Sequence, residues 1–207
     1  MNQKNSLGLN ECFLDMDNPF DLFKIWMEKA KKSEVNHPNA TSLATSDKDN
    51  NPSVRMVLLK SVTKDGFIFY TNLNSKKSLD IKENPKASMC FYWKSLLRQV
   101  RINGSINMVE DVEADKYFNT RDYDSRINAW ASEQSKILKK REDLLNKIQE
   151  YKKKFSKSNS LPRPTNWSGW CLIPTSIEFW LNRENRNHER LRYDKNNGGW
   201  KKILLNP

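Results

Sequence analysis

Short stretches rich in β-branched and aromatic residues follow one another closely in the first half of the chain, and this arrangement constrains the fold most. They cover residues 40–46, 54–59, 67–71, 87–93 and 97–109, with polar turns such as Asp65-Gly66 between them. The close spacing is typical of a compact antiparallel barrel rather than of a parallel sheet with long helical crossovers. We expect residues 54–59 and 67–71 to form a strand pair closed by the turn at Asp65-Gly66.

Helical patterns flank and interrupt these strands. Asn18 and Pro19 supply an N-cap and a favoured first helical residue, and they predict a helix that continues to about Lys32. Residues 75–82 predict a short basic helix, residues 137–155 a longer one, and residues 170–181 and 200–205 further strands. We therefore expect a flexible arm over residues 1–17 and a single domain over residues 18–207. This domain is mainly β with flanking helices (α+β), and it carries a helical insertion over about 112–157.

The charge balance limits the classes of partner. The chain has 36 Lys and Arg against 25 Asp and Glu, a formal net charge of +11, which attracts phosphate esters, nucleic acid or an anionic membrane surface without choosing among them. The three cysteines have no CxxC spacing and only two histidines are present, which argues against a disulfide framework or a metal site. The polar N-terminus and the lack of a long apolar run predict a cytoplasmic protein.

Cations gather at the ends of the strand segments between residues 53 and 77. Arg55 and Lys60 belong to the first segment, and Lys76 and Lys77 follow the second. An apolar strand pair with cationic ends is suited to hold a flat ring system that carries a phosphate tail. The alternative is that these lysines only keep the strand ends soluble.

A second group of polar residues has helical spacing. Tyr117, Arg121 and Ser125 are four residues apart, so an unbroken helix places a phenol, a guanidinium and a hydroxyl along one stripe suited to a phosphate. The alternative is a solvated helix face, and a helix break at residues 122–124 would disrupt the stripe.

A third group alternates along the sequence. Arg186, His188, Arg190 and Arg192 are spaced by two, which places them on one face of an extended segment. Cations this close repel one another unless an anion lies between them. The pattern therefore favours another anion site near the C-terminus.

Several motifs in a fixed order resemble those of one family. They are RMVLLK (55–60), FYTN (69–72), NSKK (74–77), RQV (98–100), KYF with Arg121 and Ser125, AWAS.QS (129–135), W.G (167–169) and IEFW with R.H.R (177–190). Their order and spacing, from about residue 18 to the C-terminus, closely resemble those of the pyridoxamine 5′-phosphate oxidase family.

The resemblance implies a split β-barrel of Greek-key type and a homodimer with FMN at the subunit interface. The implied reaction is oxidation of pyridoxamine or pyridoxine 5′-phosphate to pyridoxal 5′-phosphate, with dioxygen reduced to hydrogen peroxide and no metal, nucleic acid or membrane involved. The implied FMN contacts are Arg55, Met56, Val57, Leu58, Leu59, Lys60, Tyr70, Thr71, Lys76, Lys77, Gln99, Gln134, Ser135, Trp180 and Arg190. The implied substrate contacts are Lys60, Tyr117, Arg121, Ser125, Arg186, Asn187 and His188, with Arg186 and His188 as the catalytic residues over the pyridine ring.

The chain departs from the family pattern at three places. Lys76 replaces the usual Arg, Asn187 replaces an apolar residue, and the N-terminal arm lacks an RREY-like motif. These departures concern the substrate more than the cofactor, so a split-barrel oxidase for a phenazine-type substrate is one alternative. A flavin- or pyridoxal-phosphate-binding module without turnover is another. A basic nucleic-acid-binding protein is a third alternative, which is supported only by the net charge and the scattered aromatic residues.

Overall fold

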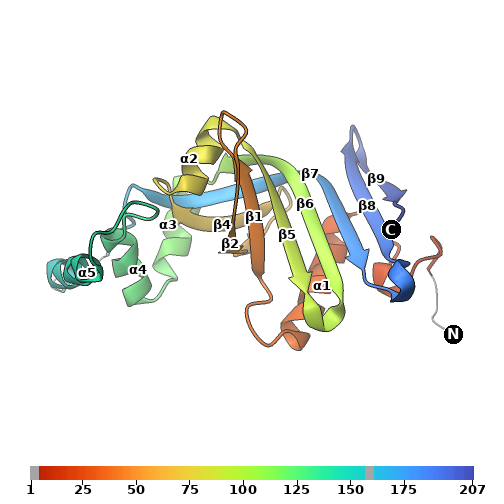
Figure 1. Cartoon of the computed structure of the whole chain (residues 1–207), viewed down its shortest axis with the longest axis horizontal. Coiled ribbons are helices and arrows are strands. Elements are labelled where there is room, and N and C mark those ends of the chain that lie inside the picture. Colours follow the sequence, from red (N-terminus) through yellow and green to blue (C-terminus); the bar gives the residue numbers. More distant parts are fainter. Residues whose placement is uncertain (1–4, 157–160) are drawn as a thin grey trace.

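The structure, a computed structural model, describes residues 5–156 and 161–207 (Figure 1). The α-helices are α1 (Pro19–Ser33), α2 (Lys76–Glu83), α3 (Asp111–Asn119), α4 (Tyr123–Ala131) and α5 (Arg141–Phe155). The strands are β1 (Ala40–Ser46), β2 (Pro52–Leu58), β3 (Ser61–Val62), β4 (Phe67–Asn72), β5 (Lys86–Trp93), β6 (Arg98–Met108), β7 (Trp167–Leu181), β8 (Glu189–Asn196) and β9 (Gly199–Leu204). Short 3₁₀ turns cover η1 (Glu11–Phe13), η2 (Lys94–Leu96) and η3 (Glu184–Arg186).

Within the described residues the strands form one antiparallel sheet in the order β2-β1-β5-β6-β7-β4-β3, with β8 added to β7 and β9 to β8. The expected antiparallel arrangement is therefore confirmed. The register of β6 and β7 shifts at Asn103/Gly104, where a Cβ on Gly104 would lie 2.0 Å from the carbonyl oxygen of Ile173. Glycine at this bulge thus lets the two longest strands approach and bend.

Helix α1 covers one face of the curved sheet and supplies much of the core. The side chain of Asn18 accepts a hydrogen bond from the Phe20 amide and Pro19 follows it, so the predicted helix start is confirmed. The buried Phe23 ring lies 4.9 Å from Phe67 of β4 and 5.3 Å from Phe91 of β5. These contacts fix α1 across several strands and leave the opposite end of the sheet to α3, α4 and α5 (Figure 1).

The expectation of a flexible arm is wrong for residues 5–17. Phe13 is fully buried, and Trp26 Nε1 of α1 donates a hydrogen bond of 2.7 Å to the Cys12 carbonyl. The Tyr193 hydroxyl of β8 donates to the carbonyl of Met16 at 2.8 Å. These residues show no periodic pattern because they fill gaps in the core individually. Residues 1–4 of the expected arm lie outside the described residues.

The expected pairing of the second and third strand segments is also wrong. Strand β2 pairs only with β1 and lies at an edge of the sheet, whereas β4 pairs with β3 and β7. The turn at Asp65-Gly66 closes the hairpin of β3 and β4, and the Lys60 amide donates to the Ile68 carbonyl at 2.8 Å. Backbone pairing of β4 is thereby completed without β2.

Two expected side-chain stripes are interrupted. The helix over Tyr117 and Ser125 is broken between α3 and α4, because the Asp122 carboxylate caps α4 by accepting from the Ser125 amide at 2.8 Å. Near the C-terminus, β8 starts only at Glu189, so Arg186 and His188 precede the strand that carries Arg190. Arg186 has a positive φ of 58°, which ends the extended backbone there.

Candidate active site

A cavity of about 480 Å³ lies between the end of β2, strand β4 and helices α2, α3 and α4. Met56, Val57, Leu58, Lys60, Tyr70, Thr71, Lys77, Tyr117, Thr120, Arg121, Asp122, Ser125, Gln134 and Trp167 line it. The cavity thus brings together many predicted cofactor contacts with the predicted Tyr117, Arg121 and Ser125. The broken helix still presents all three to one space, since α3 and α4 both border it.

Lys77 is a buried cation whose hydrogen-bond partners are neutral. It is 7% exposed at the start of α2, and its Nζ donates to Thr71 Oγ1 and Ser75 Oγ at 3.1 Å and to Gln134 Oε1 at 3.3 Å. Within residues 5–156 and 161–207 it forms no ion pair. Burial, helped by the nearby charge of Arg55, lowers the pKa of Lys77 to about 8. An anion bound in this cavity would stabilise the charged form of Lys77.

Arg121 is a second cation that forms no ion pair in the described part of the chain. Its guanidinium lies 4.8 Å from the centre of the Trp167 ring, and its Nη1 is buried without a hydrogen-bond partner. Burial lowers the pKa of this guanidinium, and the neighbouring Tyr117 and Asp122 oppose the shift. An unpartnered buried donor in a polar cavity indicates a place for a ligand oxygen.

Stacked aromatic rings form the wall beside Arg121. The Tyr70 and Tyr117 rings lie 4.0 Å apart at 12°, and Tyr70 and Trp167 lie 5.3 Å apart at 8°. A Cβ on Gly169 would lie 2.7 Å from the Tyr70 ring, so glycine is required for this ring to lie flat against β7. Burial raises the pKa of Tyr70 to about 12, so its phenol remains a hydrogen-bond donor at neutral pH.

The sequence predicted no role for Trp167 beyond its place in the W.G motif. The spacing of two was the available signal, because Trp167 and Gly169 share one face of a strand.

Arg55 and Lys76 lie outside the lining of this cavity and contact the buried Asp80 instead. Asp80 is 1% exposed and accepts hydrogen bonds from Lys76 Nζ at 2.5 Å and from Thr45 Oγ1 at 2.8 Å. Arg55 Nη2 lies 3.9 Å from the same carboxylate. Sequence reasoning did not identify Asp80, although an acidic residue facing inward from a basic helix was a signal.

The remaining predicted contacts include a row across β6, β7 and β8. Gln99, Trp180 and Arg190 are direct neighbours in the sheet register, and the His188 ring lies 4.7 Å from Trp180. His188 Nδ1 accepts a hydrogen bond of 3.2 Å from the Arg183 amide. Arg190 pairs with the buried Glu178 at 2.9 Å, so its charge is neutralised within the chain.

This row is far from the cavity along β7. Trp167 begins the strand and Trp180 lies near its end, thirteen residues later, which is roughly 40 Å at about 3.3 Å per residue. Figure 1 shows β7 running from the side of α3 and α4 towards β8. The exposed Arg186 and Asn187 lie beyond that end, where Arg186 ends η3 and Asn187 follows it. A single chain therefore separates the predicted site residues into two groups.

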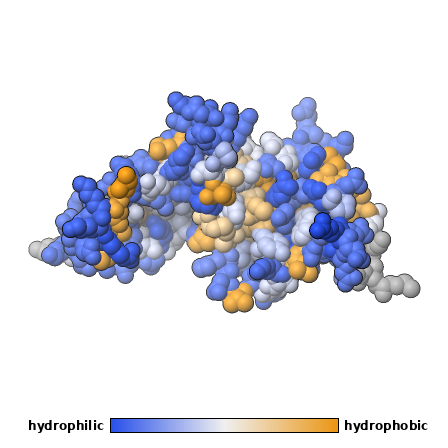
Figure 2. All heavy atoms as spheres, in the orientation of Figure 1, coloured by the Kyte–Doolittle hydropathy of each residue, from blue (hydrophilic) through white to orange (hydrophobic). Residues whose placement is uncertain are grey.

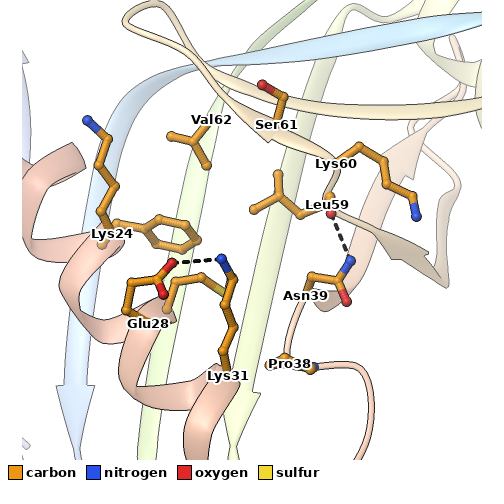
Figure 3. Close-up of a pocket in the computed structure, with 11 residues that line it drawn as sticks. Lys24, Glu28, Lys31, Pro38, Asn39, Leu59, Lys60, Ser61 and Val62 are labelled. Atoms are coloured by element: carbon orange, nitrogen blue, oxygen red, sulfur yellow. Dashed lines mark hydrogen bonds and ion pairs between the residues drawn. The ribbon is translucent and has the colours of Figure 1, made fainter. Parts of the chain in front are cut away.

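Besides Arg55 and Lys76, two further predicted contacts belong to neither group. Leu59 is 6% exposed and lines a second cavity of about 390 Å³ between α1 and residues 59–62 (Figure 3). The Asn39 side chain holds this segment by donating to the Leu59 carbonyl at 2.9 Å, and Lys60 lines both cavities. Ser135 is exposed, with a φ of 73°, directly after Gln134.

The described residues contain neither a metal-binding cluster nor a membrane-spanning helix. No group of three or more His, Cys, Asp or Glu side chains is placed to hold a metal ion there. None of the helices in that part of the chain has the length and apolar character needed to cross a membrane.

Comparisons with known proteins agree with the resemblance seen in the sequence. A family model described as pyridoxamine 5′-phosphate oxidase matches residues 27–155, and one described as pyridoxine 5′-phosphate oxidase C-terminal dimerisation region matches residues 167–207. The chain is 64% identical over 208 residues, 100% of both chains, to the pyridoxine/pyridoxamine 5′-phosphate oxidase of Pelagibacter ubique (strain HTCC1062). It is 47% identical to the protein of the same name from Rhizobium etli (strain CIAT 652), over 94% of this chain and 95% of that one.

Solved structures confirm the expected split-barrel fold. PhzG from Burkholderia lata 383, in complex with tetrahydrophenazine-1-carboxylic acid, is similar with a TM-score of 0.88 and 32% identity, over 95% of this chain and 96% of that one. A pyridoxamine 5′-phosphate oxidase-related, FMN binding protein from Nostoc punctiforme PCC 73102 is similar with a TM-score of 0.74 and 16% identity, over 93% and 99%. The second likeness bears on the fold alone.

Proposed function

Because the chain belongs to the pyridoxamine 5′-phosphate oxidase family, we propose that it is an FMN-dependent oxidase of pyridoxamine or pyridoxine 5′-phosphate. The products are pyridoxal 5′-phosphate and hydrogen peroxide. One observation carries the proposal: the cavity contains the buried Lys77 and the half-buried Arg121, and neither forms an ion pair with a carboxylate in the described residues. Two separate cations are what the two phosphates of cofactor and substrate require.

The residues around Lys77 fit the phosphate of FMN. The Lys77 ammonium offers its positive charge to a phosphate oxygen in a place from which water is largely excluded, and the Thr71 hydroxyl beside it donates to Gln134 Oε1 at 3.0 Å. Residues 56–58 and Tyr70 give the adjoining wall on which the flavin ring rests. FMN held there would supply the acceptor for a hydride from the exocyclic carbon of the substrate, and dioxygen would be the final acceptor of the two electrons.

The residues around Arg121 hold the substrate phosphate. The Arg121 guanidinium and the Tyr117 and Ser125 hydroxyls border the same cavity, and Lys60 lies at its edge. Together they supply positive charge and hydroxyl donors for a phosphate dianion. Binding there orients the pyridine ring towards the flavin and leaves the reacting carbon free of these groups.

The second group of predicted residues acts from the partner subunit of a homodimer. Gln99, Trp180 and Arg190 contact FMN, and Arg186, Asn187 and His188 lie over the pyridine ring. Their separation from the cavity along β7 supports this arrangement, as does the match of residues 167–207 to a dimerisation region. Val54 and Met56 of the edge strand β2 are 68% and 62% exposed, and Figure 2 shows apolar surface in this central part of the molecule. Such surface is suited to a subunit contact.

A mixed dimer tests the shared site. We expect Lys77→Met and His188→Ala each to be inactive as homodimers, and co-expression with two different tags yields dimers that carry one chain of each. If each site takes Lys77 from one subunit and His188 from the other, one site of the mixed dimer is intact, with about half of the wild-type activity. If both residues of a site come from one chain, each site of the mixed dimer carries one lesion and the dimer is inactive. The control is the double variant Lys77→Met/His188→Ala paired with wild type.

The two arrangements differ in this control. In the shared arrangement the double variant damages both sites of its dimer with wild type, whereas in the single-chain arrangement it damages only one. In addition, a shared site leaves the mixed dimer of single variants active, and a single-chain site leaves it inactive because each chain carries one lesion. Activity of the control dimer together with an inactive mixed dimer would contradict the shared site.

An anaerobic titration tests the substrate. Pyridoxine 5′-phosphate added to the FMN-loaded protein should bleach the flavin absorbance, and air should restore it with formation of pyridoxal 5′-phosphate. The likeness to PhzG makes a partly reduced phenazine carboxylic acid the comparison compound. Bleaching by that compound and not by pyridoxine 5′-phosphate would reject the proposed substrate while keeping the flavin.

A further inference from the structure

Trp167 contacts two groups that the proposed function places around the substrate phosphate, Tyr117 and Arg121, and also the Tyr70 ring of the flavin wall. Its ring is nearly parallel to those of Tyr70 and Tyr117, at 5.3 Å and 8° and at 6.2 Å and 4°. The Arg121 guanidinium lies 4.8 Å from its ring centre. Trp167 itself is 6% exposed and lines the cavity. One buried indole thus fixes two of the proposed phosphate ligands at once.

Trp167 is itself held rigidly at the start of β7. Its amide donates to the Pro164 carbonyl at 3.0 Å, and its carbonyl accepts from Arg163 Nη1 at 2.7 Å. Arg163 is bound in turn by Asp111 at 2.7 Å and Asp115 at 2.6 Å, both on α3. The Phe118 ring of α3 packs against the indole edge at 5.1 Å and 67°. The strand end and the helix that carries Tyr117 are therefore locked together around this side chain.

The kind of contact decides what Arg121 can do. A carboxylate at this place would hold the guanidinium but neutralise it, as Glu178 does for Arg190 on β8. An aromatic face attracts the cation through its quadrupole and leaves the N–H donors and the net charge available. The buried and unpartnered Nη1 of Arg121 agrees with this. The indole therefore orients the Arg121 guanidinium without neutralising its positive charge.

We propose that Trp167 is a positioning residue that holds Arg121 and Tyr117 in the orientation that binds the substrate phosphate. The proposal rests on the proposed function for the identity of the phosphate ester. It assigns to Trp167 no contact with the reacting atoms. Replacement should therefore weaken binding of the phosphate and leave the chemical step and the binding of FMN largely unchanged.

The test compares Trp167→Leu, Trp167→Phe and the control Trp200→Leu as FMN-loaded proteins. Trp200 also has a cation over its ring, Lys195 at 5.8 Å, but it lies on β9 outside the cavity lining. The measurements are KM and kcat for pyridoxine 5′-phosphate, the dissociation constant of inorganic phosphate by calorimetry, and that of FMN by fluorescence.

For Trp167→Leu we expect KM and the dissociation constant of inorganic phosphate to rise together by about tenfold or more, the scale of one lost charge-assisted contact. The kcat and FMN affinity should stay within about threefold of wild type. Trp167→Phe keeps an aromatic face and should recover most of the loss, and Trp200→Leu should resemble wild type. Equal losses of FMN and phosphate binding, or unchanged phosphate binding in Trp167→Leu, would overturn the proposal.

A second measurement covers the case in which Trp167→Leu does not fold. Growth with increasingly fluorinated tryptophans weakens the negative face of the indole with little change of shape, so the dissociation constant of phosphate should rise stepwise. The series should be flat in Trp167→Phe, and a flat series in wild type would refute the role. If wild type binds phosphate in this Trp167-dependent way but oxidises no substrate, the proposed function fails and the positioning role stands.

Discussion

The two ends of β7 handle buried charge in opposite ways. At the cavity end, the hydrogen-bond partners of Lys77 among the described residues are neutral, and the guanidinium of Arg121 lies over an aromatic ring. At the β8 end, the buried Glu178 accepts from Arg190 at 2.9 Å and lies 3.6 Å from Arg101. A cation without a carboxylate keeps its charge for a ligand, whereas a cation paired within the chain contributes to the fold. The density of basic residues alone does not distinguish these cases.

The largest effect should follow from removing the cavity cation. Lys77→Met takes away the charged donor proposed for the FMN phosphate, so the dissociation constant of FMN should rise by at least about 100-fold, or roughly 3 kcal/mol. Arg192→Met is the matched control, because Arg192 pairs with Asp194 at 2.9 Å within β8. Fluorescence titration of FMN measures both. Comparable losses in the two variants would remove the distinction between free and paired cations.

An intermediate effect should follow from breaking the pair at the other end. Arg190→Met leaves the carboxylate of Glu178, 6% exposed, with only the more distant Arg101. We expect the free energy of unfolding of the protein without FMN to fall by about 2 to 3 kcal/mol in urea titrations at pH 7. The double variant Arg190→Met/Glu178→Gln removes the stranded charge and should regain part of this loss. A single variant as stable as wild type would contradict the structural role of the pair.

The smallest effect concerns pH. Burial lowers the pKa of Lys77 to about 8 in the folded protein from the ordinary 10.5, so between these values the unfolded chain binds more protons than the folded one. The free energy of unfolding without FMN should therefore rise by about 1 to 2 kcal/mol from pH 8 to pH 10, and the cost of burying the charge is fully present below pH 8. Lys77→Met should lack this rise in urea titrations. Parallel pH profiles for the two proteins would disprove the lowered pKa.

Local patterns predicted much of the fold, and the failures lie in what local patterns do not encode. The cap at Asn18 and the strand segments were correct because each depends on adjacent residues. The pairing of β2 with β4 was wrong because the turn at Asp65-Gly66 leads into the two-residue strand β3. The packing of Phe13 was missed because a single core residue has no period.

The sequence predicted some residues of the candidate site and missed others. Motif order located Lys77, Arg121 and Ser125, which the structure brings to one cavity. It did not reveal Asp80, whose burial depends on contacts with β1 and β2. The sequence also did not predict that these residues fall into two separate groups, because the distance between the groups depends on the length of β7.

The register of β4 against β7 has a consequence for how the protein is made. Phe67 pairs with Leu172 and Asn72 with Trp167, so the two sides of the cavity come from parts of the chain about a hundred residues apart. During synthesis, Tyr70 leaves the ribosome long before its neighbours Trp167 and Gly169 exist, and β4 waits without its partner on that side. The cavity cannot close until most of the protein has been translated. Binding of the proposed FMN to this cavity is therefore expected only late in synthesis.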